Sequence, residues 1–149
     1  MIRWLARAAL GSLAACAPVG EEGAKPAALA TPAGSVPAAI DREWAVFELA
    51  GATVVGREPT IGFRDGRVFG FAGCNRYTGP VSFMGGDGIK VRAAAMTMMA
   101  CPDPMMELEQ RFSQTLERVA RWQVADGVLL LRAADGQVLA RARLAPPAP

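Results

Sequence analysis

Histidine is absent from the 149 residues of this sequence. Its absence removes the side chain that most often acts as general base, as zinc ligand, or as the partner of a serine or cysteine nucleophile. The sequence also lacks an apolar run near 18 residues, so no membrane-spanning helix is expected in the mature chain. It contains no phosphate loop, nucleophile elbow or pair of carboxylates at a suggestive spacing. These absences argue against an enzyme, and we expect neither a metal nor another cofactor.

The first 16 residues, "MIRWLARAALGSLAAC", indicate export. Arg3 and Arg7 precede a short apolar stretch without any acidic residue, and small residues lead to Cys16. This pattern resembles a signal peptide over residues 1–15 with a bacterial lipobox, and predicts that Cys16 carries lipid and anchors the protein to a membrane. An ordinary cleaved signal peptide and a misplaced start codon are the alternatives. Because Ala17 rather than aspartate follows, the pattern favours an outer-membrane lipoprotein that faces the periplasm of a bacterial cell envelope.

Loss of residues 1–15 changes the charge balance. The full chain has 16 Lys and Arg residues and 14 Asp and Glu residues, and cleavage leaves 14 of each sign. A nucleic-acid partner is therefore not expected. The lipidated cysteine and a Pro- and Ala-rich tether occupy residues 16–40, a folded domain is predicted over 41–144, and residues 145–149 read as a disordered tail.

Hairpins dominate the predicted domain. Asp-Gly pairs at 65–66, 126–127 and 135–136 stand between apolar runs, and this dipeptide tolerates the positive φ angles of tight hairpin turns. Pro80 would place its strand at a sheet edge or at a bulge. The predicted strands cover residues 43–49, 59–63, 68–73, 76–84, 89–93, 121–125, 128–133 and 137–144.

One amphipathic helix is predicted after residue 102. Asp103 is expected to cap it, and Pro104 suits its first turn. One apolar stripe recurs at steps of three and four residues, and consists of Met105, Leu108, Phe112, Leu116 and Val119. The fold class is therefore α+β, a curved antiparallel sheet with one helix packed on it.

Two motifs in fixed order carry a family resemblance. They are "GCNRYTG" at 73–79 and "AMTMMAC" at 95–101, followed by the helix and a strand meander. With Trp44 near the domain start, the region 41–144 resembles the META domain, the family of the bacterial heat-shock protein HslJ. Met98 stands where an arginine is frequent, so no contact is assigned to it. The resemblance implies a small cracked barrel, like the lipoprotein pilots of secretins, in an envelope protein linked to stress tolerance. It implies no agreed chemical reaction.

The two cysteines of the domain are Cys74 and Cys101. A thiolate nucleophile would lack a histidine base, and zinc would need more ligands. With Cys16 lipidated, one pair remains in an oxidising compartment, which favours a Cys74–Cys101 disulfide. Two unbridged buried thiols, and metal or redox chemistry, remain as alternatives.

Methionines surround Cys101. Soft sulfur ligands would suit Cu(I), but methionine also fills irregular cores well, and a flexible core lining under the helix is the favoured interpretation. The cluster consists of Met96, Met98, Met99, Met105 and Met106.

The remaining polar residues of the first motif are Asn75, Arg76 and Tyr77. In the favoured structural interpretation Asn75 bonds nearby backbone, Arg76 pairs with an acid, and Tyr77 is half buried with its hydroxyl in water. In the alternative the three residues form a binding rim, with Arg76 as a forked donor to a partner or an anionic ligand.

These observations predict a non-catalytic, lipid-anchored envelope protein that binds other proteins or supports envelope integrity under stress. The second interpretation is a carrier that holds a small apolar ligand inside the sheet. An open pocket lined by Met and Phe would favour the carrier. A filled interior beside an exposed apolar patch would favour protein binding.

Overall fold

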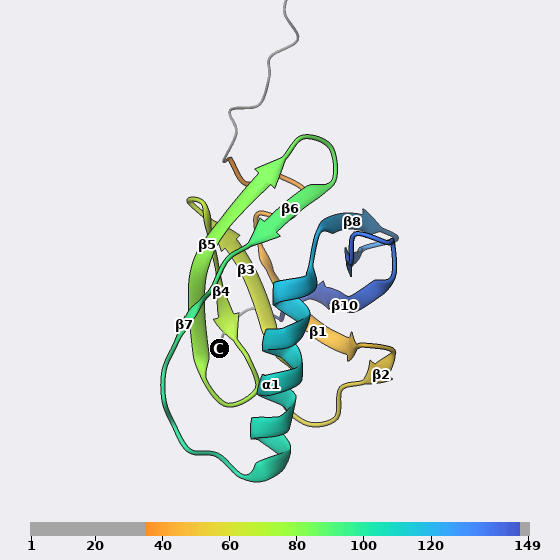
Figure 1. Cartoon of the computed structure of the whole chain (residues 1–149). Coiled ribbons are helices and arrows are strands. Elements are labelled where there is room, and N and C mark those ends of the chain that lie inside the picture. Colours follow the sequence, from red (N-terminus) through yellow and green to blue (C-terminus); the bar gives the residue numbers. More distant parts are fainter. Residues whose placement is uncertain (1–34, 147–149) are drawn as a thin grey trace, which may run out of the picture. The chain divides into compact units, whose positions relative to one another are not determined.

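The computed structural model describes residues 35–146 (Figure 1). The predicted signal peptide, Cys16, most of the tether and residues 147–149 lie outside the described residues. The elements are, in chain order, β1 (Glu43–Leu49), β2 (Ala52–Thr53), β3 (Thr60–Arg64), β4 (Arg67–Phe71), β5 (Arg76–Met84), β6 (Gly88–Val91), β7 (Ala95–Met96), α1 (Asp103–Arg118), β8 (Arg121–Ala125), β9 (Val128–Arg132) and β10 (Val138–Leu144).

The strands form one antiparallel sheet whose pairings close into a ring. The order around it is β1, β3, β4, β5, β6, β8, β9 and β10, and β10 returns to pair with β1. The short strands β2 and β7 pair with β1 and β5 respectively, beside the ring. The predicted α+β class, a curved antiparallel sheet with one helix, is therefore confirmed (Figure 1).

The strand pairing around the ring is least extensive between β6 and β8. Their register contains one residue pair, Gly88 with Arg121, whereas β1 and β10 share five. Two further backbone hydrogen bonds connect the strands at this seam. The Ile89 N–H donates to the Ala120 carbonyl (3.0 Å), and the Trp122 N–H donates to the Asp87 carbonyl (2.9 Å). This weak seam matches the cracked arrangement that the family resemblance implies.

The Asp-Gly turns lie where the sequence predicts them. Asp65 and Gly66 have φ angles of 49° and 70°, and they join β3 to β4 in the geometry that this dipeptide favours. The edge position expected from Pro80 is wrong, because β5 pairs on both sides. Pro80 lies where β5 changes partners, after its pairing with β7 ends at Thr78 and before its pairing with β6 begins at Val81. The missing N–H is tolerated at this interruption.

Helix α1 covers the core with the predicted stripe. Phe112 is fully buried and packs its ring edge-on against Tyr77 of β5, with 5.4 Å between ring centroids. Burial of a phenylalanine contributes about 1.5–3 kcal/mol. Capping by Asp103 is wrong: Pro102 is the N-cap residue, no side chain caps the helix, and Asp103 already lies in the first turn. Its negative charge still suits the positive end of the helix dipole.

The packed region begins before the predicted boundary at residue 41. Ile40 is fully buried, its carbonyl accepts a hydrogen bond from the Trp44 indole N–H (3.4 Å), and Val36 packs against the core. The end of the segment read as tether therefore belongs to the fold, because its bulky apolar residues find a place in the core. The described residues include no helix with the length and hydropathy needed to span a bilayer.

Candidate functional site

The loop between β4 and β5 brings the two cysteines together. Cys74 and Cys101 form a disulfide, with their Cα atoms 6.0 Å apart, and Cys74 is almost completely buried. Gly73 precedes Cys74 with a φ of 128°, and a Cβ atom there would lie 3.2 Å from the Glu109 nitrogen and from the Met105 carbonyl of α1. The glycine of the "GCN" motif therefore lets this loop lie directly on the helix backbone.

Asn75 is the centre of a hydrogen-bond network that ties three segments together. Its side-chain nitrogen donates to the Met99 carbonyl and to a Glu109 carboxylate oxygen, each at 3.2 Å. Its side-chain oxygen accepts from the Thr97 hydroxyl (2.9 Å) and the Met99 N–H (2.7 Å). The amide is 2% exposed and uses its full bonding capacity. Asn75 therefore joins the loop before β5, the segment before α1 and α1 itself, rather than bonding to neighbouring backbone as expected.

Glu109 completes this network from the helix. Its other carboxylate oxygen accepts the Asn75 backbone N–H at 2.6 Å, and the residue is only 9% exposed. Glu109 was not predicted as a site residue, although the sequence contains a signal for it. It lies four residues after Met105 and three before Phe112, on the apolar stripe itself.

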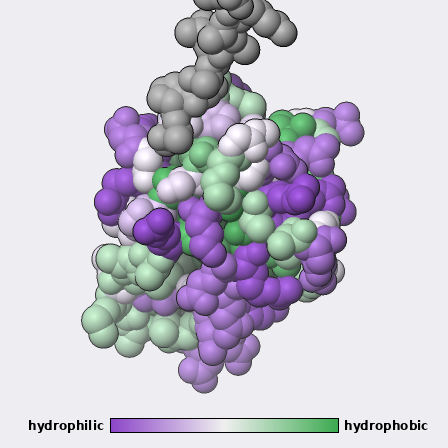
Figure 2. All heavy atoms as spheres, turned by 45° about the horizontal axis from the view of Figure 1, so that its top comes forward, coloured by the Kyte–Doolittle hydropathy of each residue, from purple (hydrophilic) through white to green (hydrophobic). Residues whose placement is uncertain are grey.

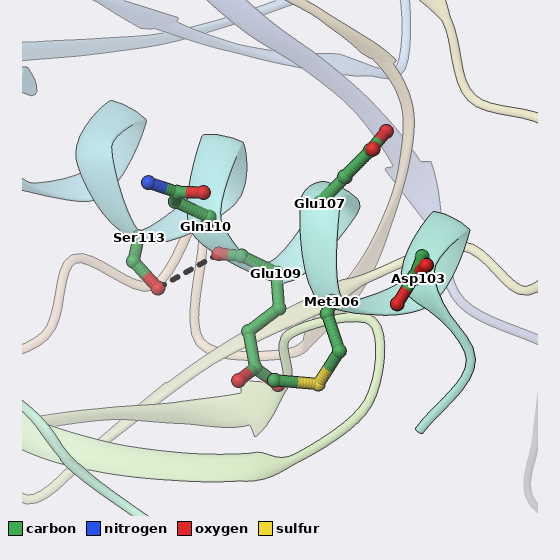
Figure 3. Close-up of a pocket in the computed structure, with 6 residues that line it drawn as sticks. All are labelled: Asp103, Met106, Glu107, Glu109, Gln110 and Ser113. Carbon is green, nitrogen blue, oxygen red and sulfur yellow. Dashed lines mark hydrogen bonds between the residues drawn. The ribbon is translucent and has the colours of Figure 1, made fainter. Parts of the chain in front are cut away.

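Helix α1 borders an open hollow of about 440 Å³ that includes Glu109 (Figure 3). Figure 3 shows Glu107 pointing away from Glu109, whose side chain points to the same side of the helix as that of Met106. The Ser113 hydroxyl donates to the Glu109 backbone carbonyl (2.8 Å), so this hydroxyl is already hydrogen-bonded within the helix. Within residues 35–146, Cys, Asp and Glu form no group of three able to hold a metal ion. Of the polar groups that line this hollow, the Glu109 carboxylate and the Ser113 hydroxyl are already bonded within the protein.

Tyr77 is buried rather than half buried. Its hydroxyl donates to the Thr60 carbonyl at 3.0 Å, and the residue is 3% exposed. Burial raises the pKa of the Tyr77 hydroxyl well above its ordinary value, and the negative charge of Glu43 raises it further. The expectation of a hydroxyl in water fails because β5 lies inside the sheet, with this side chain facing α1.

Stability is expected to fall as the pH rises above about 10, the pKa of an unfolded tyrosine. The folded state holds the Tyr77 proton above that pH whereas the unfolded state releases it, so the free energy of unfolding falls by about 1.4 kcal/mol per pH unit. Denaturant unfolding between pH 8 and 11 measures this slope. Since Tyr77 is the sole tyrosine, tyrosinate absorbance reports on it alone. Tyr77→Phe is the control that should lack the slope, and tyrosinate appearing near pH 10 in the folded protein would contradict the prediction.

Arg76 is placed by its backbone and leaves its side chain exposed. The Arg76 N–H donates to the Thr97 hydroxyl (3.1 Å), and the Arg76 carbonyl accepts from the Thr97 N–H (3.0 Å). In the described part of the chain its guanidinium forms no ion pair, so the expected acidic partner is absent. Arg76 is thus the member of the predicted polar group whose side chain the fold leaves available.

Three methionines of the cluster are not part of a core lining, whereas Met96 of β7 does pack against the core. Met98 is 98% exposed and Met99 56% exposed, while Met106 is also exposed. The segment from residue 97 to 100 has no regular secondary structure. Figure 2 shows a continuous apolar area at its lower left, the side on which Figure 1 draws the segment between β7 and α1. We call Met98, Met99 and Met106 the methionine surface.

An open groove of about 430 Å³ adjoins this surface. We call it the arginine groove, and its walls include Arg57, Arg76, Phe71, Met99, Met105 and the Cys74–Cys101 disulfide. The guanidinium carbon of Arg57 lies 3.9 Å from the centroid of the Phe71 ring, a cation–π contact. Arg57 carries no signal in the sequence, because it lies in the loop between β2 and β3 and shares the groove with Arg76 only through the fold.

Comparisons with known proteins agree with this fold. The model of the META domain family matches residues 38–146. Among curated proteins, none matches the chain. Three solved structures are similar. An NMR structure is 25% identical, with 70% of this chain and 90% of that chain covered and a TM-score of 0.55. An NMR structure of a protein from Burkholderia xenovorans is 22% identical, with 86% of this chain and 100% of that chain covered and a TM-score of 0.58.

The third is the crystal structure of a DUF4847 family protein from Bacteroides vulgatus ATCC 8482, which is 14% identical, with 71% of this chain and 94% of that chain covered and a TM-score of 0.51. At such identities the second and third structures speak for the fold alone. The family match covers nearly all of the described residues, and the chain belongs to the META domain family.

Proposed function

We propose that this protein is a non-catalytic, lipid-anchored component of a bacterial cell envelope that binds another protein through the methionine surface. The observation that carries the proposal is the exposure of Met98 and Met99 beside a tightly filled core. Thioether side chains adapt to different partners, and exposed apolar areas on soluble domains mark interaction sites. The network around Asn75 holds the backbone of this surface in place, which lowers the entropic cost of binding.

Support for a non-catalytic role comes from the engagement of the polar groups. Asn75 and Glu109 bond to each other, and the Tyr77 hydroxyl bonds to Thr60. The absence of histidine from the sequence points the same way. A role in envelope stress tolerance is proposed from the family to which the chain belongs.

Carriage of an apolar ligand inside the sheet has less support. Large side chains occupy the interior of the ring, among them Trp44, Ile61 and Leu129, each of which is buried. The hollows described above lie on the surface instead. An apolar ligand would therefore have to displace core side chains, at a cost in packing.

The anchor is tested by replacing the cysteine of the lipobox. Cys16→Ser is expected to abolish fatty-acid labelling and to release the protein from the membrane fraction, because the acyl chains attached there provide the binding energy. Ser12→Ala, a change in the same segment that keeps the cysteine, serves as the control and should behave as the unmodified chain. Unchanged membrane association of the Cys16→Ser variant would refute the lipid anchor.

Protein binding is tested by site-specific photo-crosslinking in living cells. A photoreactive amino acid at position 98 is expected to give a discrete adduct with one partner protein, identified by mass spectrometry. The same amino acid at position 84 is the matched control, since Met84 is also an exposed methionine but lies at the end of β5. Equal adducts at both positions, or none at position 98, would contradict binding through the methionine surface.

A further inference from the structure

The arginine groove combines two unpaired cations with an apolar floor. Three arginines of the described chain, Arg121, Arg141 and Arg143, each form an ion pair with an acidic residue. Arg57 and Arg76 form none, although both border the same groove. A guanidinium binds a carboxylate strongly because its donors match the two carboxylate oxygens. The groove is thus complementary to a negative charge that the protein itself does not supply.

The fold fixes the Arg57 guanidinium and the Arg76 backbone before any ligand arrives. The Phe71 ring lies against the Arg57 guanidinium, and the ring itself is buried. The Arg76 backbone is fixed to Thr97 by bonds in both directions. Part of the entropic cost of ordering the Arg57 side chain is therefore already met by the fold.

The floor of the groove selects against a small, fully hydrated anion. Phe71, Met99, Met105 and the disulfide present carbon and sulfur atoms, which gain by contact with an apolar group. A suitable ligand therefore carries a carboxylate next to a bulky apolar group. Met99 belongs both to this floor and to the methionine surface, so a bound chain passes from one to the other without a break.

We propose that the arginine groove binds an extended segment of a partner protein in which an aspartate or glutamate adjoins a bulky apolar residue. The carboxylate lies between Arg57 and Arg76, and the apolar side chain contacts Met99 and Met105. This inference rests on the proposed function, because it names the chemistry of the partner segment. A peptide is favoured over an enclosed small molecule because the groove is open along its length and continues onto the methionine surface.

The test is an NMR titration of the full chain carrying Cys16→Ser. The probe is acetyl-Gly-Phe-Asp-Leu-Gly-amide, and its counterpart has Asn in place of Asp. The Asp peptide is expected to shift the Nε–H signals of Arg57 and Arg76, and to bind about tenfold more tightly than the Asn peptide, the effect of one lost charge-assisted contact. Arg57→Gln and Arg76→Gln should each weaken binding by a similar factor.

Arg111→Gln is the matched control, since Arg111 is an exposed arginine on α1 away from the groove, and it should leave binding unchanged. Equal binding of both peptides, no binding of either, or insensitivity to Arg57→Gln and Arg76→Gln would overturn the inference. Binding of decanoate at the groove without binding of the Asp peptide would also overturn it, in favour of a carrier. The crosslink at position 98 can also be tested in cells that produce the Arg57→Gln variant. If it persists there, the proposed binding through the methionine surface stands and the inference about the groove is wrong.

Discussion

Replacement of Asn75 with alanine is expected to lower the free energy of unfolding by about 3–5 kcal/mol. The change removes four side-chain hydrogen bonds at once, to Thr97, to both backbone groups of Met99 and to Glu109. It also leaves the buried Glu109 carboxylate with one remaining bond, from the backbone N–H of residue 75. Denaturant unfolding followed by tryptophan fluorescence measures the loss, and a loss below about 1 kcal/mol would show that water replaces the amide.

Two further variants separate the amide chemistry from simple loss of volume. Asn75→Asp keeps the size of the side chain but brings a second carboxylate against Glu109, so it is expected to destabilise the fold at least as much as alanine. Adding Glu109→Gln to that variant restores a donor facing the new carboxylate and should recover part of the stability. Thr97→Val, which removes one hydroxyl from the network, should cost only about 1 kcal/mol.

Loss of the Cys74–Cys101 disulfide is expected to cost about 3–4 kcal/mol of stability. The bridge joins residues 27 positions apart, and closing a loop of that length restricts the unfolded chain considerably. The measurement compares unfolding of the Cys16→Ser chain with and without reductant. The double variant Cys74→Ala, Cys101→Ala is compared with the reduced protein, so that loss of the buried sulfur is separated from loss of the crosslink.

The same protein allows a direct count of thiols. Unfolded in denaturant without reductant, the Cys16→Ser chain should show no titratable thiol, and two should appear after reduction. Two titratable thiols before reduction would contradict the bridge and would leave Cys74 as a buried apolar residue. Equal stability with and without reductant would contradict the expected contribution to folding.

The local elements followed from the sequence because short-range chemistry specifies them. Asp65-Gly66 and Asp126-Gly127 adopt positive φ angles at hairpin turns, which few other dipeptides tolerate. The spacing of Leu108, Phe112 and Leu116 repeats at the helical period, and the structure buries all three. The "GCN" and "MMAC" motifs pointed to the family, whose model matches the chain.

The roles of the polar residues depended on partners distant in the chain. Asn75 bonds to groups 22 to 34 residues away, and no local pattern reveals that these groups converge on its amide. Tyr77 looked amphipathic, yet its hydroxyl meets the Thr60 carbonyl inside the sheet. The methionines fit a core by composition, but the disulfide and the Asn75 network hold their segment at the surface.

The sequence by itself determined the hairpins, the helix, the family and the cysteines available for pairing, since each depends on residues adjacent in the chain or on a count. Only the tertiary structure decided the closure of the ring between β1 and β10, the burial of Glu109 and the placement of Arg57 and Arg76 on the same groove. The physical reason is that a side chain's environment is fixed by the segments that pack against it. Arg57 contacts Phe71 of β4 and lines one groove with the start of β5 and the residues around Cys101, segments that chain order alone does not bring together.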